Sequence, residues 1–115
     1  MNKSIAIVIP SYNEATNIDV LVKALNETVS NLSYDFKFVF VDDGSSDDTI
    51  AILREKSKLQ SNIFYVELSR NFGHQNALKA GIDLVKNDAD AIISMDGDMQ
   101  HPPKIIPTLI QKWEE

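Results

Sequence analysis

The chain has 115 residues, enough for one domain with one modest hydrophobic core. Hydrophobic residues make up 43% and charged residues 24%, as is ordinary for a globular protein, and the net charge of −6 argues against nucleic-acid binding or a polybasic membrane patch. The absence of cysteine excludes disulfides and thiolate metal sites. The first apolar run, Ile5 to Ile9, is too short for a signal-peptide core or a membrane span.

Strands and helices are predicted to alternate four times along the chain. Apolar runs predict strands over residues 5–9, 36–41, 63–68 and 91–95. Helical spacing of apolar residues predicts helices within residues 18–32, 50–57, 77–85 and 105–113. We expect Pro10 to end the first strand and Pro102-Pro103 to open the last helix. The third helix presents a small-residue face around Ala77 and Gly81, which suits close packing on a sheet.

The predicted strands are apolar throughout rather than alternating, which is typical of a parallel sheet covered by helices on both faces. The expected fold is therefore α/β, a Rossmann-like, mostly parallel sheet. In such folds ligands bind beyond the carboxyl ends of the strands. Polar clusters occur at all four of these ends, in residues 11–14, 42–46, 69–74 and 96–100. We expect them to form one site.

The strongest candidate motif follows the fourth strand, where Asp96 and Asp98 flank Gly97. Residues two apart on an extended chain point to the same side, so both carboxylates could face one target. Carboxylates held this close repel each other unless a cation lies between them, and divalent hard cations prefer oxygen ligands. Gln100 adds a third oxygen within reach of the same ion. A solvated turn around Gly97 is the structural alternative.

Other polar residues admit two interpretations each. Asp42 or Asp43 could accept a hydrogen bond from a base or ribose, or could cap the following turn. Tyr12 could stack on a base or be simply exposed, and Arg70 could pair with phosphate or form a surface ion pair. His74 could act as an acid or base, or could be a polar residue near a helix start, which is the more common case. Glycine-rich dinucleotide and phosphate-loop patterns are absent.

Four segments in order resemble glycosyltransferase family 2, which has the nucleotide-sugar-binding fold called GT-A. They are Ile9-Pro10-Ser11-Tyr12-Asn13-Glu14, Val41-Asp42-Asp43-Gly44-Ser45-Ser46-Asp47, Ser69-Arg70-Asn71-Phe72-Gly73-His74 and Met95-Asp96-Gly97-Asp98-Met99-Gln100-His101-Pro102-Pro103. The third and fourth are most similar to the polyprenyl-phosphate sugar transferases, the branch of dolichyl-phosphate mannose synthase and bactoprenol glucosyltransferase. Gly97 departs from the alanine usual in that branch.

The resemblance implies a role for each matching residue. Asp96, Asp98 and Gln100 would hold Mg²⁺ or Mn²⁺ on the diphosphate, with Asp98 as the catalytic residue of the motif. The other residues implied to bind the nucleotide sugar are Pro10, Tyr12, Glu14, Val41, Asp42, Asp43, Arg70 and Gly97.

The resemblance also implies a reaction. The donor would be a UDP- or GDP-sugar and the acceptor a polyprenyl phosphate, which attacks directly and inverts the anomeric carbon. Residues 1–115 would be the nucleotide-sugar-binding part, inactive by itself, with the acceptor half and any membrane attachment outside it. The expected location is cytoplasmic, with the full-length protein at the cytoplasmic face of a membrane.

Two other classes remain open. A phosphohydrolase could use Asp96 and Asp98 as nucleophile and acid, although that chemistry usually places its motif after the first strand. A non-catalytic nucleotide-binding or assembly module is the second alternative. We also expect self-association, because a missing half-domain leaves apolar surface and a sheet edge uncovered.

Overall fold

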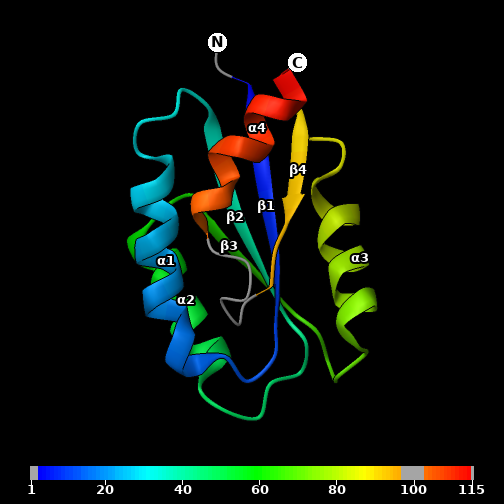
Figure 1. The fold of residues 1–115 in the computed structure, drawn as a ribbon. Coiled ribbons are helices and arrows are strands. Elements are labelled where there is room, and N and C mark those ends of the chain that lie inside the picture. Colours follow the sequence, from blue (N-terminus) through cyan, green and yellow to red (C-terminus); the bar gives the residue numbers. More distant parts are fainter. Residues whose placement is uncertain (1–2, 97–102, 115) are drawn as a thin grey trace.

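The computed structural model, which describes residues 3–96 and 103–114, contains every predicted strand and helix (Figure 1). In chain order the elements are β1 (Ser4–Ser11), α1 (Ala15–Val29), β2 (Asp35–Asp42), α2 (Thr49–Leu59), β3 (Ile63–Glu67), α3 (His74–Val85), β4 (Ala91–Ser94), a 3₁₀ turn (Pro103–Ile105) and α4 (Ile106–Glu114). The predicted alternation of strand and helix is therefore confirmed.

The four strands form one sheet in the order β3-β2-β1-β4. Every neighbouring pair is parallel, and Ile5 of β1 lies opposite Phe36 of β2 on one side and Ala91 of β4 on the other. The predicted parallel sheet is thus confirmed. Because all strands run in one direction, their carboxyl ends meet at one edge of the sheet.

Helices cover both faces of this sheet, as the uniformly apolar strands predicted (Figure 1). Ile5, Ile7 and Ile9 of β1 pack into a core with buried residues of α1, α2 and α4. Ala6 and Val8, which point the other way, pack with buried residues of α3. The period-two alternation of a strand therefore divides β1 between two cores.

Helix α3 lies unusually close to the sheet. A Cβ atom at Gly81 would lie only 2.5 Å from Val8 Cγ1 and 2.8 Å from Val41 Cγ2. Glycine is thus required by the close approach, as the small-residue face predicted. This packing fixes α3 on β1 and β2 and brings its first residue, His74, to the carboxyl edge of the sheet.

The prediction that Pro10 ends the first strand is wrong, because β1 continues through Pro10 to Ser11. The reason lies in the register. The Val8 carbonyl accepts a hydrogen bond from Met95 N (3.1 Å), so Val8, and Pro10 two residues on, direct their backbone groups toward β4. The β4 pairing has ended at Ser94, so the missing N–H of Pro10 falls where no partner strand requires it.

Two helix ends also differ from prediction. Helix α1 ends at Val29 and not at Leu32, because Leu32 N donates to the Val29 carbonyl (3.0 Å) in a closing turn. Helix α4 begins at Ile106, because Pro103 opens a 3₁₀ turn instead of the helix itself. Pro102 lies outside the described residues.

Candidate functional site

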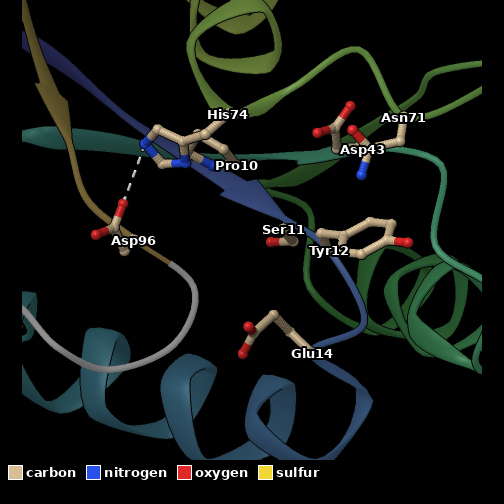
Figure 2. A pocket seen from close by; sticks show the side chains of 8 residues that line it. All are labelled: Pro10, Ser11, Tyr12, Glu14, Asp43, Asn71, His74 and Asp96. Atoms are coloured by element: carbon tan, nitrogen blue, oxygen red, sulfur yellow. Dashed lines mark ion pairs between the residues drawn. The ribbon is translucent and has the colours of Figure 1, made fainter.

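A pocket of about 350 Å³ opens at the carboxyl edge of the sheet (Figure 2). Its lining comes from the last residues of β1 and from the segments that follow all four strands: Pro10, Ser11, Tyr12, Glu14, Asp43, Asn71, His74 and Asp96. The four polar loops therefore converge, as the parallel topology predicts.

Asp43, a residue of the pocket lining that follows β2, connects the end of β1 to the segment that follows β3. Its side chain is buried, with 4% of the residue exposed. The Asp43 amide donates to the Ser11 carbonyl (2.8 Å), and the Asp43 Oδ1 accepts a hydrogen bond from Phe72 N (2.8 Å). The carboxylate is thus held in a fixed position by the backbone of the loop after β3.

The turn after β2 lies directly against that same loop. Gly44 has a φ of 74°, in the left-handed region, and a Cβ there would lie 2.5 Å from both Arg70 C and Asn71 N. Any side chain at position 44 would push the two loops apart. Asn71, whose Oδ1 accepts a hydrogen bond from Gly73 N (2.9 Å), therefore reaches the pocket.

A second set of hydrogen bonds ties the loop after β1 to the loop after β2. Asn13, with a φ of 52°, accepts from Ser46 N on its Oδ1 (2.8 Å) and donates through its own N–H to Ser45 Oγ (2.9 Å). Glu14 N donates to Thr49 Oγ1 (2.9 Å). These bonds hold the loop that carries Tyr12 and Glu14 against the loop that follows Asp43.

Asp47 completes this connection. Burial acts to raise the pKa of its carboxyl, but hydrogen bonds from the Thr49 hydroxyl and amide and from Ala15 N outweigh it and hold the pKa below its usual value. The carboxylate therefore stays charged while it bridges the starts of α1 and α2.

Asp42 differs from its neighbour. It is 2% exposed, its Oδ1 has no hydrogen-bond partner among the described residues, and it is not part of the pocket lining. Burial raises the pKa of the Asp42 carboxyl, although hydrogen bonds from Ser45 act to lower it; the charges of Glu67 and Asp47 raise it further. The sequence could not decide whether Asp42 or Asp43 belongs to the site, and in the structure only Asp43 lines the pocket.

Elsewhere in the pocket lining, His74 of α3 faces Asp96, which follows the end of β4 by two residues (Figure 2). The His74 Nε2 lies 3.2 Å from Asp96 Oδ1, and the two side chains are 51% and 28% exposed. With Glu14 and Asp43, Asp96 gives the pocket three carboxylates. Oxygen donors of this kind suit a hard divalent cation, and an anionic ligand would need such a cation to offset their repulsion.

The predicted site residues fall into three groups. Those in the pocket lining are Pro10, Tyr12, Glu14, Asp43 and Asp96. Those outside the lining are Val41, which is buried, Asp42, and Arg70, whose guanidinium lies 4.8 Å from the Phe72 ring centroid. Gly97, Asp98 and Gln100 lie outside the described residues, so their roles stay predictions.

The sequence assigned no individual site role to Ser11 or Asn71 and favoured a helix-start role for His74 over an acid or base, yet all three line the pocket. Each lies in one of the predicted polar clusters, which was the only available signal. His74 does begin a helix, as expected, but the same position also turns its ring toward Asp96.

Two negative findings apply to residues 3–96 and 103–114. No group of three or more histidine or acidic side chains there has the arrangement of a metal site. No helix of this part is both long and apolar enough to cross a membrane.

Residues 6–115 match the family described as "Glycosyl transferase family 2". The chain belongs to this family. The predicted family and the glycosyltransferase classification are therefore confirmed. The match begins in β1 and runs to the end of the chain, so all four loops of the pocket lie within it.

Curated relatives of this family 2 chain are considerably longer. The chain is 38% identical over 111 residues to "Putative glycosyltransferase CsbB" of Bacillus subtilis (strain 168). That alignment covers 96% of this chain and 33% of the relative. The chain is 36% identical over 114 residues to "Undecaprenyl-phosphate 4-deoxy-4-formamido-L-arabinose transferase" of Klebsiella pneumoniae (strain 342), covering 98% and 34%. The chain thus spans about a third of the length of these relatives.

Solved structures show the same fold. The mannosyltransferase PcManGT from Pyrobaculum calidifontis, in complex with GDP-Man and Mn²⁺, superimposes with a TM-score of 0.76 at 22% identity. The alignment covers 98% of this chain and 32% of that one. The predicted GT-A fold is confirmed by this likeness.

Proposed function

We propose that this chain is the donor-binding part of a metal-dependent, inverting glycosyltransferase that transfers a sugar from a nucleotide-diphosphate sugar to a polyprenyl phosphate. The observation that carries the proposal is the pocket at the carboxyl edge, where Asp43, Tyr12 and Asp96 come from three different loops. The acceptor half and any membrane attachment would lie in the rest of a longer protein.

The nucleoside would occupy the side of the pocket formed by the loops after β1 and β2. Tyr12 is 45% exposed, so its ring is accessible for stacking on a base beside Pro10. The fixed carboxylate of Asp43 would accept a hydrogen bond from the base or ribose. Glu14 would contact the same nucleoside, and Arg70 would neighbour its base end.

The diphosphate would lie toward β4, near Asp96. Asp96, Asp98 and Gln100 would hold Mg²⁺ or Mn²⁺, and all three supply oxygen ligands. When bound, the ion would act as a Lewis acid and stabilise the negative charge of the leaving nucleoside diphosphate. Asp98 is the residue that we assign to catalysis on this basis. The mannosyltransferase with the same fold was solved with GDP-Man and Mn²⁺, which supports the use of a divalent ion with a nucleotide sugar.

In the transfer step a phosphate oxygen of the acceptor attacks the anomeric carbon of the donor sugar. The bond between that carbon and the diphosphate oxygen breaks, and the nucleoside diphosphate leaves with the electron pair. A phosphate acceptor is already an anion at neutral pH, so the chain needs no strong general base. A single displacement inverts the anomeric carbon.

A polyprenyl phosphate is the acceptor that the relatives favour. The Klebsiella relative is named for transfer involving undecaprenyl phosphate. An acceptor of this kind is anchored in a membrane, so the longer protein would act at the cytoplasmic face, where nucleotide sugars are made.

The proposal is tested by titrating UDP and GDP into the protein with and without Mn²⁺. We expect Mn²⁺ to raise the affinity for one of the two at least tenfold, because it offsets the repulsion between the diphosphate and the pocket carboxylates. Asp98→Ala should abolish this gain, and Asp43→Ala should weaken nucleotide binding in both conditions.

Asp88→Ala is the matched control, because it removes an equally charged but exposed carboxylate before β4, at the other end of that strand. It should bind as the wild type does. Nucleotide affinity that is independent of Mn²⁺ and of Asp98 would refute the metal site. Transfer of labelled sugar to undecaprenyl phosphate by these 115 residues alone would refute the assignment of the acceptor half to the missing part.

A further inference from the structure

Asn71 lines the pocket but has no role in the proposed reaction. Its side chain closes a turn just before α3, because its Oδ1 accepts a hydrogen bond from Gly73 N (2.9 Å). A backbone N–H can only donate, so the atom that it meets must be the amide oxygen. The Asn71 Nδ2 is therefore the free end of this amide, and it has no hydrogen-bond partner in the part of the chain that the structure describes.

The carboxylate of Asp43 has one bound oxygen and one open oxygen. Its Oδ1 accepts a hydrogen bond from Phe72 N, whereas its Oδ2 has no hydrogen-bond partner among residues 3–96 and 103–114. Within the same residues, Asp42 Oδ1 is the only buried side-chain oxygen or nitrogen that lacks a partner. The Asp43 Oδ2 is therefore not closed off by the protein, and it is open to the pocket that Asp43 lines.

These two open atoms lie at one end of the pocket, beside an aromatic ring. The approach of the two loops at Gly44 keeps Asp43 and Asn71 together. Figure 2 shows both side chains at the end of the pocket where the Tyr12 ring lies, away from Asp96. A base stacked on Tyr12, which is 45% exposed, can direct its edge toward one acceptor and one donor.

An acceptor beside a donor distinguishes the nucleobases by one edge. Uracil presents its ring N3–H beside a carbonyl, and guanine presents N1–H beside the O6 carbonyl, so both match this pair. Cytosine and adenine have the opposite order, because an amino group lies beside an unprotonated ring nitrogen. In the same position, that nitrogen would direct its lone pair at the Asp43 carboxylate, and the amino group would face the N–H groups of Asn71.

We propose that Asn71 is a specificity-determining residue, which with Asp43 selects a base that has a ring N–H beside a carbonyl. The Asp43 Oδ2 accepts from the ring N–H, and the Asn71 Nδ2 donates to the carbonyl. The proposal rests on the proposed function in one respect, since it takes a nucleotide as the ligand of this pocket. It requires neither the metal ion nor the acceptor.

The test compares the Kd values of UDP, CDP, GDP and ADP by isothermal titration calorimetry. We expect UDP to bind about tenfold more tightly than CDP, or GDP about tenfold more tightly than ADP, because each good pair of hydrogen bonds to a base edge discriminates by about this factor. The tighter of UDP and GDP identifies the base. The ratio should be the same with and without Mn²⁺, because the ion would act on the diphosphate that all four nucleotides share.

Asn71→Asp separates base selection from the turn. The variant keeps an oxygen for Gly73 N but replaces the donor with a second acceptor. Its added charge repels all four diphosphates alike, so the ratio of Kd values is the readout, and we expect the wild-type preference to be lost. Adding Asp43→Asn reverses the order of donor and acceptor, so the double variant should prefer CDP to UDP, or ADP to GDP. Asn87→Ala removes an exposed amide beyond the other end of α3 and should keep the wild-type ratio.

Each outcome has a distinct meaning. An unchanged ratio in Asn71→Asp would overturn the proposal, since Asn71 would then serve only its turn. Equal wild-type affinities within both nucleotide pairs would also overturn it. Binding of UDP or GDP that Mn²⁺ does not strengthen would refute the metal site and leave base selection intact. If none of the four nucleotides binds, the proposed function is wrong and base selection is refuted with it. Thermal unfolding of each variant confirms that it is folded.

Discussion

Asp42 and Asp43 are adjacent in the sequence, but only Asp43 lines the pocket. Both are nearly inaccessible, with 2% and 4% exposed. Consecutive residues at a strand end point in opposite directions, so only Asp43 faces the pocket, where its Oδ1 accepts a hydrogen bond from Phe72 N. The sequence Asp-Asp-Gly contains no signal that separates the two, because the choice depends on the loop after β3.

The buried carboxyl of Asp42 gives a prediction about stability. We expect Asp42→Asn to raise the free energy of unfolding at pH 7 by roughly 1 kcal/mol, because it removes a buried charge with an unsatisfied oxygen. Burial raises the folded-state pKa of Asp42 above its usual 3.8, so the folded protein binds this proton more tightly than the unfolded chain.

The sign of the pH dependence follows from this shift. Wild-type stability should fall as the pH rises from 3.8 through the raised pKa, whereas the asparagine variant lacks this contribution. The advantage of Asp42→Asn should therefore be largest at pH 7 and should shrink toward pH 4. Denaturant unfolding at both pH values measures it, with exposed Asp88→Asn as the control. An advantage that grew on acidification would contradict the buried-charge explanation.

At the scale of elements, the loops after β1 and β2 behave as one unit because Asn13 and Glu14 are bonded to residues 45–49. Asn13 contributes both its side-chain oxygen and a left-handed backbone conformation, which asparagine adopts more readily than most residues. The helices and strands around these loops follow from apolar spacing, whereas hydrogen bonds between residues 32 to 35 positions apart in the sequence leave no periodic pattern.

Two substitutions at Asn13 separate these contributions. Asn13→Ala should lower the free energy of unfolding by about 2 kcal/mol, because it loses the bond from Ser46 N and strains a φ of 52°. Asn13→Gly keeps the backbone conformation and should cost about 1 kcal/mol. Chemical denaturation measures both. Equal losses would mean that backbone strain plays no part, and unchanged nucleotide affinity in Asn13→Ala would mean that the loops need no tie to form the pocket.

At the scale of the whole molecule, an apolar groove of about 400 Å³ runs beside β4, the last strand in the order of the described sheet. Its lining is Ala91, Ile92, Ile93, Ser94, Leu109, Ile110 and Trp113. Leu109 and Trp113 are each 40% exposed. An edge strand beside exposed apolar side chains favours pairing with another strand.

We predict that two copies of the chain associate through this groove, with β4 paired to β4 about a twofold axis. Sedimentation at increasing concentration should show a rising mean mass. Leu109→Lys should shift the association to at least tenfold higher concentration, since it places a charge in the groove. Leu84→Lys makes the same change at a 58% exposed leucine on α3 and should have no effect. A monomer mass at every concentration would refute the prediction.

The fold could be predicted from sequence further than the site could. The pattern of apolar residues was sufficient to predict the helices from their helical spacing. It also predicted the strands and the parallel sheet, because strands that are buried on two faces have uniform apolar runs such as Ile5–Ile9. It also located the loops of the pocket. It could not assign individual side chains, because the placement of His74 depends on the packing of Gly81 and that of Asn71 on the approach of Gly44.

The unequal pairing of β1 has a consequence for the shape of this edge. On one side β1 remains paired with β2 as far as Ser11, but on the other side it is paired with β4 only as far as Val8. The three-residue difference leaves a step about 10 Å deep in the rim of the sheet. Pro10 lies within that step and has no N–H to offer toward β4, so the shorter strand cannot extend along it and close the gap. Pro10, which the sequence predicted to end β1, thus keeps this edge of the sheet open beside β4.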